Sequence, residues 1–203
     1  MRIRLLSALA AILLGSCSKK SPMPPPTELG TFEVESGKLF VVDPGYPPEK
    51  PGVSELAEVI PHARKGTWSF AVVYVNAGQA GVRCAELRAR HASLPSTQGL
   101  KWRRQQGLVG VDSGQAGVFD AGYYHEKQIV PKNKVWKEKP LDPDDLWYSL
   151  CCEVTLGNAQ AGVIPFGGVS SSGFGDGAYE WDSVEAGGEV VAVRVIFLKD
   201  GDF

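Results

Sequence analysis

Short runs of β-branched and aromatic residues, each ended by glycine, proline or aspartate, recur between residues 31 and 198 and mostly alternate with polar residues. This period of two predicts half-buried β-strands, and the turn residues between the runs predict tight connections. The 24 glycines and 14 prolines agree with many turns rather than with a helical bundle. The sequence therefore predicts one α+β domain over residues 30–203, with a mostly antiparallel sheet and one or two short helices.

Individual elements can be placed on this pattern. Two hairpins are expected, one joining 31–35 to 38–42 and one joining 108–111 to 116–119. Asp142-Pro143-Asp144-Asp145 predicts a helix start, because it offers an N-cap, a proline at the first helical position and acidic residues near the positive helix end. The tetrapeptide Gln-Ala-Gly-Val, which occurs three times, is interpreted as a turn between strands. The other expected strands cover 68–75, 82–90, 163–166, 178–181 and 190–198, and for the charged segment 82–90 a frayed helix is the alternative.

The first seventeen residues resemble a bacterial lipoprotein signal peptide. Two arginines precede an uncharged apolar run at 5–14, which is too short to span a hydrocarbon core of about 30 Å as a helix. Leu14-Gly15-Ser16-Cys17 supplies the aliphatic residue, the two small residues and the cysteine of a lipidation site. We expect a signal peptide over 1–16, acylation of Cys17 and a proline-rich tether over 17–29. The alternative is an ordinary secretory signal with an incidental cysteine.

The lipid anchor at Cys17 predicts a membrane-attached protein of the bacterial cell envelope. Ser18 stands where an aspartate would favour inner-membrane retention, so the outer membrane is the expected location. No later segment has 18 uncharged apolar residues, so no spanning helix is expected. Removing Arg2 and Arg4 with the signal changes the formal charge from −2 to −4, which argues against nucleic acid as a partner.

Three further cysteines, Cys84, Cys151 and Cys152, would enter an oxidising compartment after export. A disulfide between Cys84 and one of the adjacent pair would close a loop of about 67 residues, contributing roughly 4 kcal/mol on the loop-entropy model. The alternative is three free thiols. Zinc is not expected, because adjacent cysteines are poorly spaced for chelation and the sequence has no C-x-x-C motif.

The segment 170–179 is the densest polar and glycine-rich stretch. Its Gly173-x-Gly175-x-x-Ala178 spacing matches a loose dinucleotide motif, but that motif needs a following helix and a second βαβ half. The sequence has no nucleophile elbow, H-E-x-x-H motif, phosphate-binding loop or EF-hand loop, and no cofactor is expected.

Asp112, Asp120 and Asp176 are the remaining candidates for chemistry. The simpler interpretation is that each carboxylate accepts backbone N–H groups in a turn, as is also expected of Asp43 before Pro44. The alternative is that the three gather to bind a polar ligand or a divalent cation.

The histidines and the one basic segment have ordinary interpretations. His62, His91 and His125 are scattered, and none has a partner at metal-ligand spacing. Lys101-Trp102-Arg103-Arg104 is expected to be a solvated loop rather than an anion site. The five tryptophans fit a β-rich core, with a carbohydrate groove as the alternative.

Three segments also carry a family resemblance in their combined order: Ser36-Gly37-Lys38-Leu39 with Asp43-Pro44, then Gly110–Asp120, then Ser171–Tyr179. Together they resemble the bacterial family catalogued as domain of unknown function 4241, over about residues 30–203. The resemblance implies a single β-rich domain and assigns no catalytic residue. It makes the segments that hold Asp112, Asp120 and Asp176 the first places to look for a shared site.

These features predict an envelope lipoprotein that binds another protein without catalysing a reaction, for example as an immunity factor against an exported toxin. The alternative is an envelope hydrolase, or a ligand- or cation-binding protein, that uses Asp112, Asp120 and Asp176. A third possibility is a structural envelope protein that self-associates through an apolar patch. The placement of the three carboxylates separates the first two hypotheses.

Overall fold

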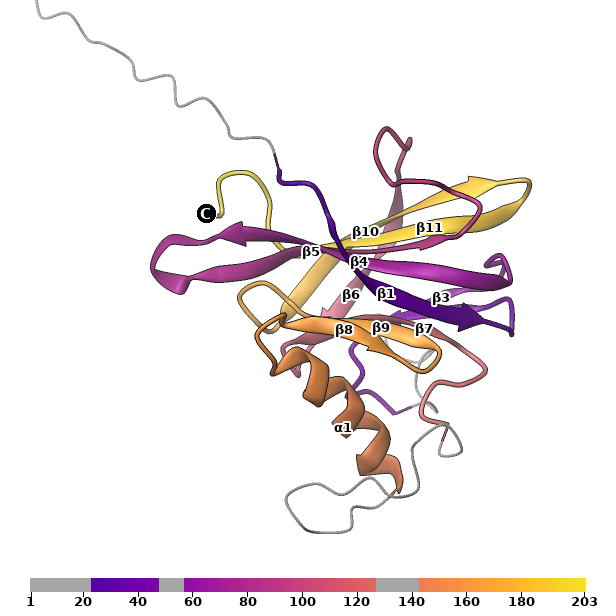
Figure 1. The fold of residues 1–203 in the computed structure, drawn as a ribbon, viewed down its shortest axis with the longest axis horizontal. Coiled ribbons are helices and arrows are strands. Elements are labelled where there is room, and N and C mark those ends of the chain that lie inside the picture. The colour runs from indigo at the N-terminus through magenta and orange to yellow at the C-terminus, as the bar shows by residue number, and fades with distance from the viewer. Residues whose placement is uncertain (1–22, 48–56, 127–142) are drawn as a thin grey trace, which may run out of the picture.

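Two stacked antiparallel β-sheets form the body of the protein (Figure 1). The computed structural model describes residues 23–47, 57–126 and 143–203. In spatial order, the larger sheet contains β1 (Thr27–Val34), β4 (Gly66–Asn76), β5 (Val82–His91), β11 (Glu189–Ile196), β10 (Gly177–Ala186) and β6 (Arg103–Val111). The smaller sheet contains β3 (Glu58–Ile60), β2 (Leu39–Val42), β7 (Gln115–Asp120), β9 (Gly167–Ser171) and β8 (Ala161–Ile164). The prediction of one β-rich, mostly antiparallel domain is confirmed.

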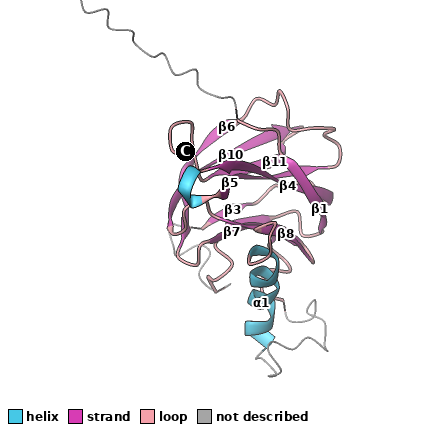
Figure 2. Ribbon diagram, turned by 60° about the vertical axis from the view of Figure 1, so that its left-hand side comes forward, coloured by secondary structure: helices cyan, strands magenta, loops and turns pink. Residues whose placement is uncertain are grey.

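One long helix, α1 (Pro143–Thr155), packs against β8 and β9 on the outer side of the smaller sheet (Figure 2). It begins where the Asp-Pro-Asp-Asp signal predicts a helix start. A short 3-10 turn, η1 (Gly78–Ala80), joins β4 to β5. In the described ranges, no helix has the length and apolar character needed to cross a bilayer.

The main core lies between the two sheets. Trp68, Phe70 and Val72 alternate along β4 and are each fully buried there, which is the half-buried pattern that the sequence shows. The same cluster contains Leu87 and Val193 from neighbouring strands of the larger sheet, and Val41 and Val118 from the smaller sheet. Burying each of these large apolar side chains contributes about 1.5–3 kcal/mol.

A second, smaller core lies between the smaller sheet and α1. Trp147 and Cys151 of the helix pack there with Phe119 of β7 and Val169 of β9. The rings of Phe119 and Trp147 are 5.3 Å apart. The smaller sheet is therefore buried on both faces, which explains why all six residues of β7 are buried.

Both predicted hairpins are wrong. β1 pairs with β4 and β2 pairs with β3 and β7, so the turn at 35–38 carries the chain from the larger sheet to the smaller one. β6 pairs with β10 and β7 pairs with β2 and β9, so the turn at 112–114 makes the same kind of crossing. The turn at 172–176, between β9 and β10, is a third crossing. A tight turn between two alternating segments has the same local sequence signal in a hairpin and at a sheet-to-sheet corner.

Smaller differences concern where elements begin. β1 begins at Thr27, three residues before the expected domain boundary, and Met23 already packs on the main core. β6 begins at Arg103, inside the segment expected to be a loop. The Gln-Ala-Gly-Val segment at 115–118 lies within β7 rather than in a turn, whereas Gln79 lies in η1 and Gln160 precedes β8.

Candidate functional site

Asp43 holds the corner between β6 and β7. Its fully buried carboxylate accepts the backbone N–H groups of Asp112 and Ser113, at 2.8 and 2.7 Å, through Oδ2. Oδ1 accepts the Ser113 hydroxyl at 2.6 Å and the N–H of Gly45 at 2.7 Å. Four donors around one carboxylate fix this turn against β2.

Asp120 does the same for the corner between β1 and β2. Its Oδ2 accepts the N–H groups of Glu35 and Ser36, at 2.5 and 2.9 Å, and its Oδ1 accepts the N–H of Gly122 at 2.8 Å. The side chain is completely buried. Because three donors use this carboxylate, it has little capacity left for a ligand.

Asp112 and Asp176 are more exposed and lie near each other. Asp176 accepts the N–H of Gly114 at 3.0 Å and so joins the corner between β9 and β10 to the one between β6 and β7. Asp112 accepts the Tyr46 hydroxyl at 2.8 Å. The pKa of Tyr46 is raised well above its usual value, first by burial, then by the hydrogen bond to Asp112 and by the charges of Asp43 and Asp176.

The structure therefore separates the three aspartates that the sequence singled out. Asp112 and Asp176 lie at one end of β7 and Asp120 lies at the other end. Within residues 23–47, 57–126 and 143–203, no cluster of three or more His, Cys, Asp or Glu side chains could hold a metal ion. What these aspartates do in the structure is accept turn N–H groups and a tyrosine hydroxyl.

Of the two alternatives for the cysteines, the structure has the free thiols: Cys84, Cys151 and Cys152 form no disulfide with one another. Cys84 lies in the core between the sheets and Cys151 lies in the core under α1, so the smaller sheet stands between them. Burial raises the pKa of Cys84 to about 12 and raises that of Cys151 well above its usual value. Both thiols are therefore protonated and unreactive near neutral pH.

A buried polar network ties α1 to β7. The Gln115 amide donates to the Tyr148 hydroxyl at 3.1 Å and to the Cys152 sulfur at 3.5 Å, and it accepts from the Thr155 hydroxyl at 3.0 Å. The pKa of Tyr148 is raised to about 12, mainly by burial. These contacts fix the helix on the sheet.

The structure also places two of the histidines and four of the tryptophans. His91 bonds to the Ser93 hydroxyl and the Lys65 carbonyl, and His125 bonds to the Pro44 carbonyl. Trp102 does not lie free in a basic loop, because the Arg194 guanidinium stacks over its ring at 4.8 Å. Three other tryptophans, Trp68, Trp147 and Trp181, are buried; Trp136 lies outside the described residues.

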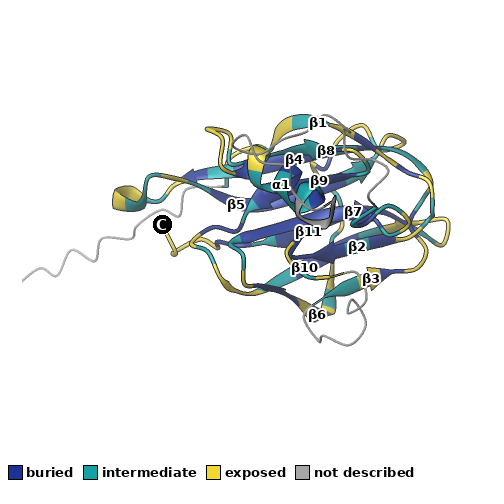
Figure 3. Cartoon of the chain, turned by 90° about the horizontal axis from the view of Figure 1, so that it is seen from below, coloured by how far each residue is buried: buried dark blue, intermediate teal, exposed yellow. Residues whose placement is uncertain are grey.

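A different site, which the sequence analysis did not find, opens between β3 and β6, which lie beside each other at one side of the sandwich (Figure 3). We call it the edge cleft; its volume is about 340 Å³. Its walls come from both sheets: Glu58, Val59, Ile60, Pro61 and His62 on one side, and Gln105, Trp181, Ser183, Glu185, Gly188 and Val190 on the other.

Trp181 and Glu58 meet in the edge cleft. Trp181 is only 5% exposed, and in the part of the chain that the structure describes its indole N–H has no hydrogen-bond acceptor at bonding distance and angle. The N–H lies near enough to the Glu58 carboxyl to oppose the rise that burial causes in the pKa of that group. The Glu58 carboxylate lies over β6, where a Cβ on Gly107 would come 1.4 Å from Oε1.

Backbone bonds fix the shape of the edge cleft. The N–H of Val190 donates to the His62 carbonyl at 2.7 Å, and the N–H of Arg64 donates to the Val190 carbonyl at 3.0 Å. On the opposite wall, the Gln105 amide donates to the buried Ser183 hydroxyl at 2.9 Å. The site is thus formed before any ligand enters it.

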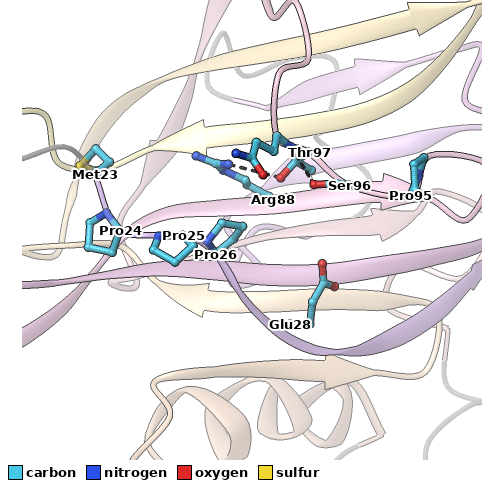
Figure 4. A pocket seen from close by; sticks show the side chains of 10 residues that line it. Met23, Pro24, Pro25, Pro26, Glu28, Arg88, Pro95, Ser96 and Thr97 are labelled. Atoms are coloured by element: carbon cyan, nitrogen blue, oxygen red, sulfur yellow. Dashed lines mark hydrogen bonds between the residues drawn. The ribbon is translucent and has the colours of Figure 1, made fainter.

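A second hollow, of about 480 Å³, lies under the proline segment that precedes β1 (Figure 4). Arg88 forms part of its wall, but Glu86 accepts from Nε and Nη2 of the guanidinium and Thr97 accepts from Nη1. Because each of the three guanidinium nitrogens already donates within the protein, this hollow offers a ligand less than the edge cleft does.

Comparison of the chain with protein-family models, curated proteins and solved structures finds no match. The resemblance to the family of domain of unknown function 4241 therefore stays a prediction.

Proposed function

We propose that this chain is a lipid-anchored, protein-binding module of the bacterial cell envelope that catalyses no reaction itself. The observation that carries the proposal is the edge cleft. It is preformed, it lies between two strand edges, and it contains a buried indole N–H that has no acceptor at bonding distance and angle among the described residues. The anchor is Cys17, which lies outside the described residues, and Ser18 after it supports the outer membrane as the location.

The roles of the aspartates support binding rather than hydrolysis. A hydrolase would need carboxylates that are free to take a proton or to hold a cation near a substrate. Of the three aspartates in the hydrolase hypothesis, Asp120 uses its oxygens on backbone N–H groups at a sheet corner and lies at the opposite end of β7 from Asp112 and Asp176. An immunity role against an exported toxin is the form of binding that suits a tethered envelope protein.

Membrane attachment is tested by fractionating cells that produce the wild type, Cys17→Ser or Cys152→Ser. The proposal expects wild type and Cys152→Ser in the membrane pellet, because Cys152 is far along the chain in α1. Cys17→Ser should accumulate as the unprocessed precursor. Normal processing and full sedimentation of Cys17→Ser would reject the anchor.

Protein binding is tested by chemical cross-linking in the native host, followed by affinity purification of the full-length protein from detergent-solubilised membranes. The proposal expects one protein at a constant ratio to the bait. For an immunity role, deleting the gene should make cells sensitive to a toxin secreted by neighbouring cells. Recovery of no partner, together with unchanged sensitivity, would reject the proposal.

A further inference from the structure

The edge cleft has an acidic character. Glu58 and Glu185 lie in its walls, and none of the described residues that line it is a lysine or an arginine. Burial is the main cause of the raised pKa of Glu58, and the influence that opposes it is the Trp181 N–H rather than a cation. A ligand with a positive charge at this position would supply the missing partner.

The same cleft offers a donor for a neutral acceptor. Among the described residues the buried Trp181 N–H has only the Glu58 carboxyl nearby, outside bonding geometry, and a buried N–H in that state is destabilising unless a ligand satisfies it. The ligand therefore needs a carbonyl or similar oxygen close to its positive charge.

The strands around the cleft favour an extended chain as the ligand. β3 pairs only with β2 and β6 pairs only with β10 among the described strands, so each has one edge free in that set. Free edges bind extended polypeptides through backbone hydrogen bonds. The volume of about 340 Å³ suits one long side chain with its adjoining backbone rather than a cofactor.

We propose that the edge cleft binds an extended segment of a partner protein through a lysine side chain. The lysine ammonium faces Glu58 and Glu185, and a backbone carbonyl beside it accepts the Trp181 N–H. This assignment deepens the proposed protein-binding function and rests on it.

The test uses the full lipidated chain in detergent micelles with ¹⁵N-labelled tryptophan, observed by NMR. The probe is the peptide acetyl-Ala-Lys-Ala-amide, and its matched control replaces the lysine by norleucine, which keeps the side-chain stem and lacks the ammonium. The Trp181 indole signal is assigned with Trp181→Phe. We expect it to move saturably with the lysine peptide and to stay in place with the norleucine peptide.

Two variants test whether the Glu58 carboxylate is the negative charge that binds the lysine ammonium. Glu58→Gln should weaken binding of the lysine peptide by about tenfold or more, because the ammonium loses its nearest opposite charge. Glu33→Gln removes an exposed carboxylate from β1, at the opposite edge of the larger sheet, and should leave the affinity unchanged. The indole spectrum of each free variant shows whether the fold is intact.

Absence of a saturable shift at millimolar lysine peptide would overturn the assignment, as would equal affinity for the norleucine peptide or for Glu58→Gln. If the titration fails while membranes still yield one cross-linked partner, the edge cleft is not the binding site and the proposed function stands. If the peptide binds and membranes yield no partner, the proposed function fails and the chemistry of the cleft stands.

Discussion

Replacing Asp43 by alanine is the most informative perturbation of the fold, because one buried carboxylate organises an entire sheet-to-sheet corner. The substitution leaves the N–H groups of Gly45, Asp112 and Ser113 without their acceptor, and it frees the Ser113 hydroxyl. We expect a large loss of stability from the removal of three atoms that lie at the end of the sandwich.

The magnitude follows from the number and exposure of these donors. A buried N–H that loses its acceptor destabilises a protein by about 1–3 kcal/mol. Gly45 and Asp112 are exposed residues, so water takes up part of their bonding, whereas Ser113 is half-buried. The expected total is therefore about 3–5 kcal/mol, a large share of the roughly 5–15 kcal/mol that holds a domain folded.

The assay is urea unfolding of the wild type, Asp43→Ala and Asp176→Ala, followed by tryptophan fluorescence. Asp176 is the matched control, because it accepts a single N–H, from Gly114, at the same end of the sandwich and is exposed. Asp176→Ala should lose only about 0.5–1 kcal/mol. The slope of the unfolding free energy against urea should be the same for all three proteins.

Two results would refute this reasoning. One is a loss below about 1 kcal/mol in Asp43→Ala, which would mean that water replaces the carboxylate completely. The other is an equal loss in Asp43→Ala and Asp176→Ala, which would mean that burial and the number of donors do not set the effect.

Three further outcomes are expected. In native protein at pH 8, iodoacetamide should leave Cys84 and Cys151 unmodified, while mass spectrometry after labelling in urea finds both alkylated; rapid native labelling would contradict their burial. The free energy of unfolding, measured in urea at fixed pH values, should be highest below pH 9 and fall towards pH 12. The reason is that folding raises the pKa of Cys84 from 9.0, and that of Tyr74 from 10.0, to about 12, so the folded state keeps protons that the unfolded chain releases. A flat profile would show that neither group is coupled to folding. Gly168→Ala should lose about 1–3 kcal/mol in urea unfolding, because its Cβ would lie 2.3 Å from the Phe70 ring, and an unchanged midpoint would show that the ring moves freely.

The strands and the helix could be predicted from the sequence because their signals are local. The β-branched and aromatic run at 68–75 corresponds to β4, the preference for a strand over a helix at 82–90 corresponds to β5, and the Asp-Pro-Asp-Asp segment marks the start of α1. The strands with which β1 and β2 pair could not be predicted from a local signal. Both segments alternate and a tight turn joins them, but which sheet each enters depends on contacts with distant strands.

The contacts in the candidate sites also join segments that are distant in the sequence, so local signals predict only part of them. A turn role for Asp43 could be predicted from the proline that follows, but the donors that it binds at Asp112 and Ser113 lie 69 and 70 residues further along the chain. The edge cleft joins Glu58 of β3 to Trp181 of β10, and neither residue lies in a motif. No local pattern marks a tryptophan whose N–H is buried without an acceptor.

Site-specific photo-cross-linking in living cells tests the central claim most directly. A photoreactive amino acid is placed at His62, an exposed residue on the wall of the edge cleft, or at Leu156, which is 78% exposed just beyond the end of α1. The account predicts one cross-linked protein from position 62, its loss in Glu58→Gln, and no such product from position 156. The same product from both positions, or none from position 62, would contradict it.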